Sequence, residues 1–192
     1  TSNDSYWLVA DLSPGSPGTR FSTHIQPIVV GDTIYFDATP HQSSLGLWAH
    51  DTSNGSTWEA VNGSNFDFGE YMTILVGDTL YFDGADGHNG ANHELWAHDT
   101  SNHSTWQVAD IGEGISSIPG YGELSLAVGD TLYFGARDGI TGWELWAHDT
   151  SNHSTWQVAD INSGTGYYGD SNPGSYMAML VGATLYFDAD DN

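Results

Sequence analysis

The sequence predicts an all-β fold in which a unit of four short antiparallel strands recurs along the chain, and two repeated phrases carry this prediction. The phrase ELWAHDTSNHSTWQVADI occupies residues 94–111 and returns unchanged at 144–161, with a looser copy at 46–62 and half a copy at 1–12. Between these copies a second phrase, of the form VGDTLYFDA, recurs at Val30, Val76, Val128 and Val181. A period of about fifty residues is typical of stacked supersecondary units.

Each unit is expected to contribute four strands in a fixed order. The first strand, as in Leu124–Val128, ends at a Gly-Asp pair, which predicts a hairpin with glycine at its first central position. The second strand follows, as in Thr131–Phe134; the third is ELWAHD, and the fourth is WQVAD. Asp, Ser and Asn of the intervening Asp-Thr-Ser-Asn satisfy turn backbone with their side chains. Helical periodicity is absent from the sequence.

Antiparallel four-stranded units repeated radially form a β-propeller, with the first strand of each blade innermost and the fourth outermost. A solenoid is the alternative, although its repeats are usually shorter. The prediction is one domain over residues 1–192, with blades at approximately 13–62, 63–111, 112–161 and 162–192 plus 1–12. The last blade lacks its third strand within the chain, which leaves an exposed edge that can template pairing. The chain is therefore expected to be a segment of a larger propeller or to assemble head to tail.

Loop lengths separate two ends of each blade. The offset from the third-strand Trp to the fourth-strand Trp is ten residues in every copy, as from Trp96 to Trp106, and the Gly-Asp hairpins are equally constant. By contrast, the connection from the fourth strand to the next hairpin ranges from fifteen residues (Asn62 to Gly77) to twenty-two (Asp160 to Gly182). Insertions on one face of a repeat protein usually mark its binding face.

The phrase ELWAHDTSN and the phrase LYF, which is followed after a few residues by Asp-Gly in two copies, resemble the ELWxxDGTxxGT repeats of bacteria and archaea, sometimes described as hyalin-like. The resemblance covers nearly the whole chain, and it departs from the family pattern where Asp-Gly-Thr becomes Asp-Thr-Ser-Asn. A second departure is in the first repeat, where Thr39-Pro40-His41 replaces Asp-Gly and Gly46 replaces Glu. The resemblance implies a secreted or surface propeller and no settled activity, because a fold does not fix a function.

The charge of the chain excludes several partners. There are 25 acidic residues against two basic ones, Arg20 and Arg137, which gives a net charge of -23. Phosphate binding needs clustered Lys and Arg, so nucleic acid is excluded, as are anionic membrane surfaces. No apolar run approaches a membrane span, and there is no cysteine. The acidic excess indicates either solubility in salty water or binding of divalent cations.

Five Asn-x-Ser sequences are candidate N-glycosylation sites. Four recur in register in the predicted turns, and one lies outside the register; they are Asn3, Asn54, Asn102, Asn152 and, outside the register, Asn62. The alternative is that Asn and Ser stand there only as turn formers.

Carboxylates cluster after the second strand of each unit and at the start of the third. They could supply the several oxygen ligands that calcium prefers, and no other cofactor is expected. The candidates are Asp83, Asp86, Asp138, Asp188, Asp190, Glu94 and Glu144. The alternative is that the Asp-Gly pairs are plain hairpin turns.

The repeated histidines and aromatics are expected to be structural. His50, His98 and His148 share one position, so each is expected to pack between blades with a bond to the neighbouring blade, and the repeated Trp residues are expected in the core. The aromatics outside the register lie in variable loops and could stack on glycans; they are Phe66, Phe68, Tyr71, Tyr121, Tyr167, Tyr168 and Tyr176. Packing of these loops on themselves is the alternative.

No catalytic residue is predicted, because the sequence contains no G-x-S-x-G elbow, H-E-x-x-H motif, P-loop or cysteine nucleophile. The prediction is a non-catalytic extracellular or cell-surface β-propeller that serves as a structural, interaction or adhesion module. Its expected partners are other copies of itself or the rest of a longer chain, and glycans. Two alternatives stay open: a carbohydrate-binding lectin using the variable face, and a polysaccharide hydrolase with carboxylates from different blades.

Overall fold

The computed structural model describes residues 8–13, 19, 26–39, 45–62, 66–86, 92–122, 124–164 and 169–191. These residues form fourteen strands in four antiparallel sheets. The first sheet contains β1 (Ile28–Val30), β2 (Thr33–Ala38), β3 (Gly46–Asp51) and β4 (Thr57–Val61). The second contains β5 (Phe66–Val76), β6 (Thr79–Asp86), β7 (Glu94–Asp99) and β8 (Thr105–Ala109). The third contains β9 (Ser125–Val128), β10 (Thr131–Arg137), β11 (Trp143–Asp149) and β12 (Ser154–Ala159). The fourth contains β13 (Ala178–Val181) and β14 (Thr184–Phe187).

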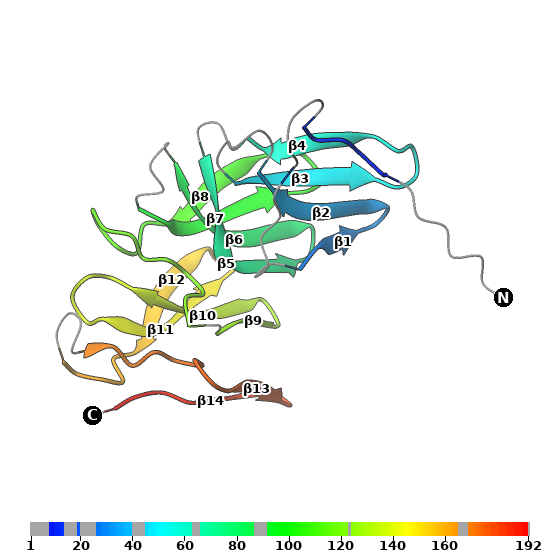
Figure 1. Ribbon diagram of the computed structural model, residues 1–192. Helices are drawn as coiled ribbons and strands as arrows, with labels where there is room; N and C mark the ends of the chain where they lie inside the picture. Colours follow the sequence, from blue (N-terminus) through cyan, green and yellow to red (C-terminus); the bar gives the residue numbers. More distant parts are fainter. Residues whose placement is uncertain are drawn as a thin grey trace.

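The strand order confirms the predicted blade. Each complete sheet has its strands hydrogen-bonded in chain order, and the fourth sheet is a hairpin of the first two strands alone. The sheets follow one another in chain order from β1–β4 to β13–β14 (Figure 1). The first strands β5 and β9 of adjacent sheets contact each other, which places the first strand of these sheets on the inner side. The architecture is that of a β-propeller. Each sheet falls within one of the four predicted blade ranges.

The Gly-Asp hairpins have the expected backbone. Val30 pairs with Thr33 across a two-residue turn, and Gly31, Gly77, Gly129 and Gly182, the last in a Gly-Ala pair, have φ between +58° and +64°. Glycine adopts this region without the steric cost that a Cβ adds, which is why it recurs at the first central position. The third and fourth strands of each complete sheet share a second local feature, a register shift between the Leu and Trp of the third strand.

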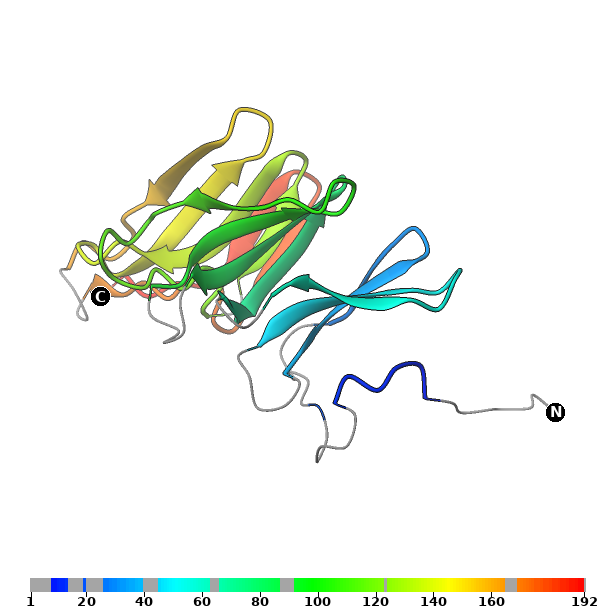
Figure 2. The same cartoon turned by 90° about the horizontal axis from the view of Figure 1, so that it is seen from above.

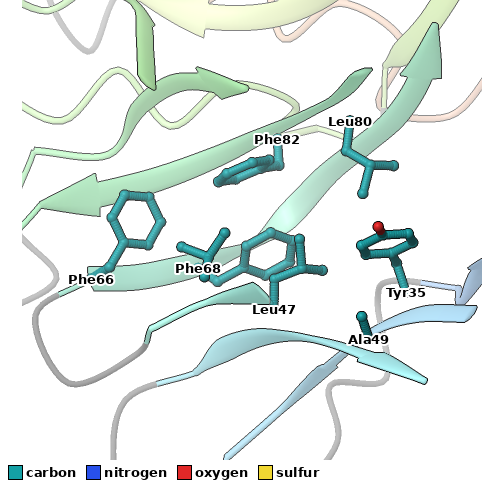
Figure 3. Close-up of a cluster of buried hydrophobic side chains, with 8 residues drawn as sticks. Tyr35, Leu47, Ala49, Phe66, Phe68, Leu80 and Phe82 are labelled. Carbon is teal, nitrogen blue, oxygen red and sulfur yellow. The ribbon is translucent and has the colours of Figure 1, made fainter. Parts of the chain in front are cut away.

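The core lies between adjacent sheets and repeats from one interface to the next. Tyr35, Leu47 and Ala49 of the first sheet face Leu80 and Phe82 of the second (Figure 3). In the next interface the equivalent residues Tyr81, Leu95 and Ala97 pack against Leu132 and Phe134. Burying these side chains removes apolar area from water, which stabilises the stack by roughly 25 cal/mol per Å².

Two expectations are wrong. Residues 8–12 do not form the fourth strand of the last sheet: they lie beside the first sheet, where they line one pocket with Ile34 and Phe36 (Figure 2), and residues 1–7 are outside the described ranges. The Trp residues of the outermost strands are also not core residues throughout, because Trp106 is 37% exposed and Trp156 is 40% exposed. These outer strands have one face toward solvent. No helix in the described ranges has the length and hydropathy of a membrane span.

Candidate functional site

The two ends of each sheet differ as the loop lengths predicted. At the constant end, the turn between the third and fourth strands is bonded to the Gly-Asp hairpin of the same sheet. Thr52 N donates to Asp32 O, and the same bond joins Thr100 to Asp78 and Thr150 to Asp130, each at 2.8 Å. The variable loops therefore lie together at the opposite end of each sheet.

The constant turn is held by one aspartate in each complete sheet. Asp99 Oδ1 accepts from Ser101 N at 2.8 Å and from Ser101 Oγ at 2.6 Å, and Asp99 Oδ2 accepts from Asn102 Nδ2 at 2.7 Å. Asn102 Oδ1 in turn accepts from Ser104 N at 2.9 Å. The hydroxyl of Ser101 and nearby amides hold the pKa of Asp99 below its usual value. Asp51 and Asp149 make the same bonds in the other two sheets.

This turn carries three of the predicted glycosylation sites. Asn54, Asn102 and Asn152 are exposed at the same position of successive sheets. Each donates one amide hydrogen to the turn aspartate, and a glycan would replace the other. Asn62 is also exposed, after β4, and Asn3 lies outside the described residues. Glycosylation stays a prediction.

At the variable end, an aspartate at or near the end of the second strand bonds the residues that lead into the hairpin-forming part of the first strand. Asp83 is fully buried, and its Oδ1 accepts from Tyr71 N and Met72 N at 3.0 Å each. Its Oδ2 lies 3.3 Å from His93 Nδ1. Asp188 repeats the pattern in the last sheet, where Oδ1 accepts from Tyr176 N at 3.1 Å and Met177 N at 2.7 Å.

The glutamate that opens the third strand has an equivalent role. Glu94 Oε2 accepts from Ile111 N and from Ser117 Oγ, each at 2.7 Å. Glu144 Oε2 accepts from Ile161 N and Ser171 Oγ, each at 2.8 Å. Burial raises the pKa of both carboxyls above the usual value, although these hydrogen bonds oppose the change. Both glutamates therefore tie the strand to the loop that leaves the same sheet.

The remaining candidate calcium ligands do not join these carboxylates in one cluster. Asp138 Oδ1 accepts from the amides of Ile140 and Thr141 within its own turn, whereas Asp86 and Asp190 are exposed. Across the described ranges, no three His, Cys, Asp or Glu side chains come together in a group that could hold a metal ion. Asp83 and Glu94 accept hydrogen bonds from backbone amides and a hydroxyl, whereas Glu144 Oε1 is buried without a hydrogen-bond partner. Calcium binding stays a prediction.

The repeated histidines were predicted to pack between sheets and to bond to the neighbouring sheet; the first part is confirmed for His98 and His148, and the second is wrong. They do pack between sheets: the Tyr35 ring lies 6.1 Å from that of His98, and Tyr81 lies 5.7 Å from His148. Their hydrogen bonds, however, stay within their own sheet, as from His98 Nδ1 to Thr105 Oγ1 at 2.9 Å. The third and fourth strands pair directly, which brings His and Thr opposite each other and leaves the neighbouring sheet to supply only ring contact.

Among the predicted ligand-face aromatics, two come together at the variable end and two do not belong there. Tyr71 and Tyr121 are 43% and 44% exposed, and their ring centroids lie 5.4 Å apart. Phe66 and Phe68 are 8% and 1% exposed, because β5 extends the sheet to pair them with Asp86 and Gly84 of β6. They are core residues, which corrects their assignment to a ligand face. Tyr176 is 95% exposed on the last sheet. Tyr167 and Tyr168 lie outside the described residues.

Two residues that lie beside Tyr121 were not predicted from the sequence. Trp143 stacks on Tyr121 with centroids 4.6 Å apart, and Arg137 Cζ lies 5.2 Å from the centroid of the Trp143 ring. Cation and ring attract each other at this separation. Two features of the sequence could have indicated these residues. Trp143 precedes Glu144 at the position where the second unit has His93, and Arg137 is one of only two basic residues in the chain. We call Tyr71, Tyr121, Trp143 and Arg137 the aromatic row.

A small polar pocket opens beside the second sheet at the variable end. Its volume is about 150 Å³, and its lining includes Asp86, Glu94, Asp110, Trp96 and Gln107. Carboxylates and an amide beside an indole ring offer acceptors and one donor for a hydroxylated ligand.

Comparison with known proteins supports the fold and leaves the activity open. No protein-family model matches the chain, and no curated protein matches it. Among solved structures, a puromycin hydrolase has a TM-score of 0.57 at 11% identity over 90% of this chain and 25% of that one. A puromycin-hydrolysing peptidase from Mycobacterium tuberculosis has a TM-score of 0.54 at 12% identity over 69% of this chain and 20% of that one. A putative TolB from Agrobacterium tumefaciens gives 0.49 at 12% identity over 79% of this chain and 54% of that one.

This chain thus spans no more than a quarter of the length of those hydrolases. At such identities the likeness shows the shared β-propeller fold alone. The number of blades in the complete propeller stays a prediction.

Proposed function

We propose that this protein is a non-catalytic structural and interaction module of the cell exterior or cell surface, which associates with copies of itself. The observation that carries the proposal is the exposure of apolar side chains on the last sheet. Met179 is 49% exposed, Val181 55% and Tyr186 52%. A contiguous exposed apolar face is typical of an interaction surface. The strand β14 also has no pairing strand on its outer edge among the described residues.

Sedimentation velocity over a concentration series tests self-association. The experiment is best done in about 0.5 M NaCl, because salt screens the repulsion between copies that each carry a net charge of -23. The expected result is a sedimentation coefficient that rises with concentration. A single monomeric species up to high micromolar concentration would overturn the proposal. Surface labelling of intact producing cells tests the location, and protection of the protein from a membrane-impermeant reagent would contradict it.

Carbohydrate binding at the variable end is the second candidate function, and the aromatic row favours it. Two half-exposed tyrosine rings beside a stacked Trp can pack on the C–H faces of a sugar, as aromatic side chains do in other binding sites. A glycan array probed with the wild type and with Tyr121→Ala tests this candidate. Tyr176→Ala is the matched control, because it removes an exposed ring that lies outside the row. Equal binding by both variants would exclude the row as a sugar site.

The non-catalytic part of the proposal has its own test, because the solved structures reported above include hydrolases. Purified protein is incubated with puromycin-derived peptides and with a panel of polysaccharides. Absence of turnover is the expected result. Turnover that copurifies with the chain would replace the proposal with a hydrolase, the second alternative from the sequence.

A further inference from the structure

Arg137 is unusual because the described part of the chain gives this cation no counter-ion. The sequence has 25 acidic residues against two basic ones, and the other basic residue, Arg20, lies outside the described residues. Among the described residues, no carboxylate forms an ion pair with Arg137. A guanidinium does not lose its proton in proteins. A partly buried positive charge is therefore held beside an aromatic ring, although the chain is rich in carboxylates.

The guanidinium of Arg137 is fixed in direction by two contacts. Its Nε donates to Ser116 O at 2.9 Å, and its Cζ lies 5.2 Å from the centroid of the Trp143 ring. A guanidinium has five N–H groups, and the bond to Ser116 uses one of them. The four N–H groups on the two Nη atoms have no acceptor among the described residues. This planar fork is the group that binds oxyanions, such as a carboxylate, through two parallel hydrogen bonds.

The carboxylates that neighbour Arg137 are engaged in other contacts or face away from it. Asp138 accepts hydrogen bonds from two amides of its own turn. Asp170 accepts from the backbone amide of Trp143, the residue that pairs with Arg137 across β10 and β11. Glu144 lies on the opposite face of the sheet, because side chains alternate along a strand. The described residues thus leave the Nη atoms available to an external acceptor.

The aromatic rings continue from this cation toward solvent. Trp143 is largely buried and stacks on Tyr121, with ring centroids 4.6 Å apart, and the Tyr121 ring lies 5.4 Å from that of Tyr71. Both tyrosine side chains are exposed. Exposed aromatic rings can pack against the C–H faces of a sugar, whereas the guanidinium can bind an anionic substituent. One surface therefore offers an apolar platform and a single positive charge side by side.

We propose that the aromatic row binds a glycan that carries isolated anionic groups, with a uronate carboxylate or a sulfate ester on the Nη atoms of Arg137 and a neighbouring sugar ring on Tyr121. The proposal rests on carbohydrate binding, the second candidate function above, and names the class of glycan. The site has one cation, and the chain has a net charge of -23, which repels polyanions. The ligand is therefore expected to carry one charge per binding site on an otherwise neutral backbone.

Three matched probes test the proposal by titration calorimetry in about 0.15 M NaCl. The first is a xylo-oligosaccharide with one glucuronic acid, the second is the same compound after reduction of its carboxyl group to an alcohol, and the third carries a sulfate ester on that alcohol. The wild type is expected to bind one or both anionic probes about tenfold or more tightly than the reduced probe, because the reduced probe lacks the charge-assisted pair with Arg137. The probe that shows this preference identifies the anion.

Variants assign the preference to Arg137. Arg137→Gln removes the charge and is expected to bind the anionic and reduced probes equally. If it does not fold, Arg137→Met removes the charge and keeps an unbranched stem against Trp143. Arg20→Gln is the charge-matched control, since it removes the only other arginine, and it should keep the wild-type preference. Tyr121→Ala should weaken binding of all three probes by a similar factor, because it removes the ring on which the sugar packs.

Each other outcome contradicts a different part of the proposal. No binding of any probe would overturn carbohydrate binding and this inference together. Equal binding of the three probes by the wild type would leave carbohydrate binding standing and refute the role of the anion. A preference that survives the removal of charge at Arg137, or that disappears equally in Arg20→Gln, would refute the assignment of the anion to Arg137.

Discussion

Lowering the pH from 7 toward 4 is expected to destabilise this protein through its buried histidines. His98 has no exposed surface and lies under the ring of Tyr35. Its Nδ1 is bonded to Thr105, whereas its Nε2 has no hydrogen-bond partner. Burial, with a contribution from the nearby His103, lowers the pKa of His98 from 6.5 to about 4, and Asp99 opposes the change. Burial also lowers the pKa of His148.

The sign and size of the effect follow from linkage. Because the folded pKa is below the unfolded one, the unfolded state binds the proton first, and stability is lost as the pH falls below 6.5. A difference of one pKa unit is 1.36 kcal/mol, so protonation of His98 costs about 3 kcal/mol when complete and about 2.5 kcal/mol by pH 4.5. His148 adds to the loss. The raised pKa values of Glu94 and Glu144 act in the opposite direction as the pH falls toward 4.5.

Denaturant unfolding followed by Trp fluorescence at pH 7, 5.5 and 4.5 measures the loss. His98→Gln is expected to be less stable at pH 7 but to lose about 2.5 kcal/mol less than the wild type on acidification, because it removes the titrating group. His153→Gln is the comparison variant, since it removes an exposed imidazole beside His148 and leaves His98 and its neighbours unchanged. If His98→Gln loses as much unfolding free energy on acidification as the wild type, the assignment of the loss to His98 is refuted.

Three further expectations follow from the described contacts. Asp83→Asn should lower the free energy of unfolding by about 1–3 kcal/mol, because Asp83 accepts hydrogen bonds from backbone amides. The loss should be the same with and without EDTA; a difference that disappears in EDTA would indicate that Asp83 binds calcium. His153→Gly should raise the free energy of unfolding by about 1 kcal/mol, because His153 has φ of +60° where the first sheet has Gly55; an unchanged midpoint in urea would contradict this. Protein from a glycosylating native source should carry added mass at Asn54, Asn102 and Asn152, and the bare polypeptide mass in intact-mass spectrometry would exclude it.

Much of the fold could be predicted because each unit repeats its local signals. The Gly-Asp pair favours a left-handed glycine, which marks each hairpin, and the turn at Asp99 has a fixed length. These signals predict the order of the strands in each sheet and the difference between the constant end and the variable end. Phe66 and Phe68 could not be placed correctly, because nothing in the sequence indicates that β5 would begin so far ahead of its hairpin. Only its pairing with β6 shows that these rings enter the core.

The candidate site was harder to predict, since the same residue types serve different chemistry. A buried carboxylate such as Glu94 or Asp83 is equally suited to a cation and to a set of amide donors, and only the distances to those donors decide between them. Arg137 and Trp143 were invisible as a pair because they stand on different strands. The sequence contained both residues, but their contact with Tyr121 depends on how the loop before β9 lies on its own sheet.

The proposed self-association depends on a balance between burial of apolar side chains and repulsion of like charges. It would bury apolar side chains that are exposed on the last sheet, such as Met179 and Tyr186. The opposing force is the net charge of -23 on each copy. Ion screening reduces this repulsion, with a Debye length of about 8 Å at 0.15 M salt and about 3 Å at 1 M, whereas burial of apolar faces persists. Association should therefore strengthen as salt rises from 0.05 to about 1 M. A dimer that dissociates over this range in sedimentation would instead indicate an interface between opposite charges, which the exposed apolar side chains of the last sheet do not provide.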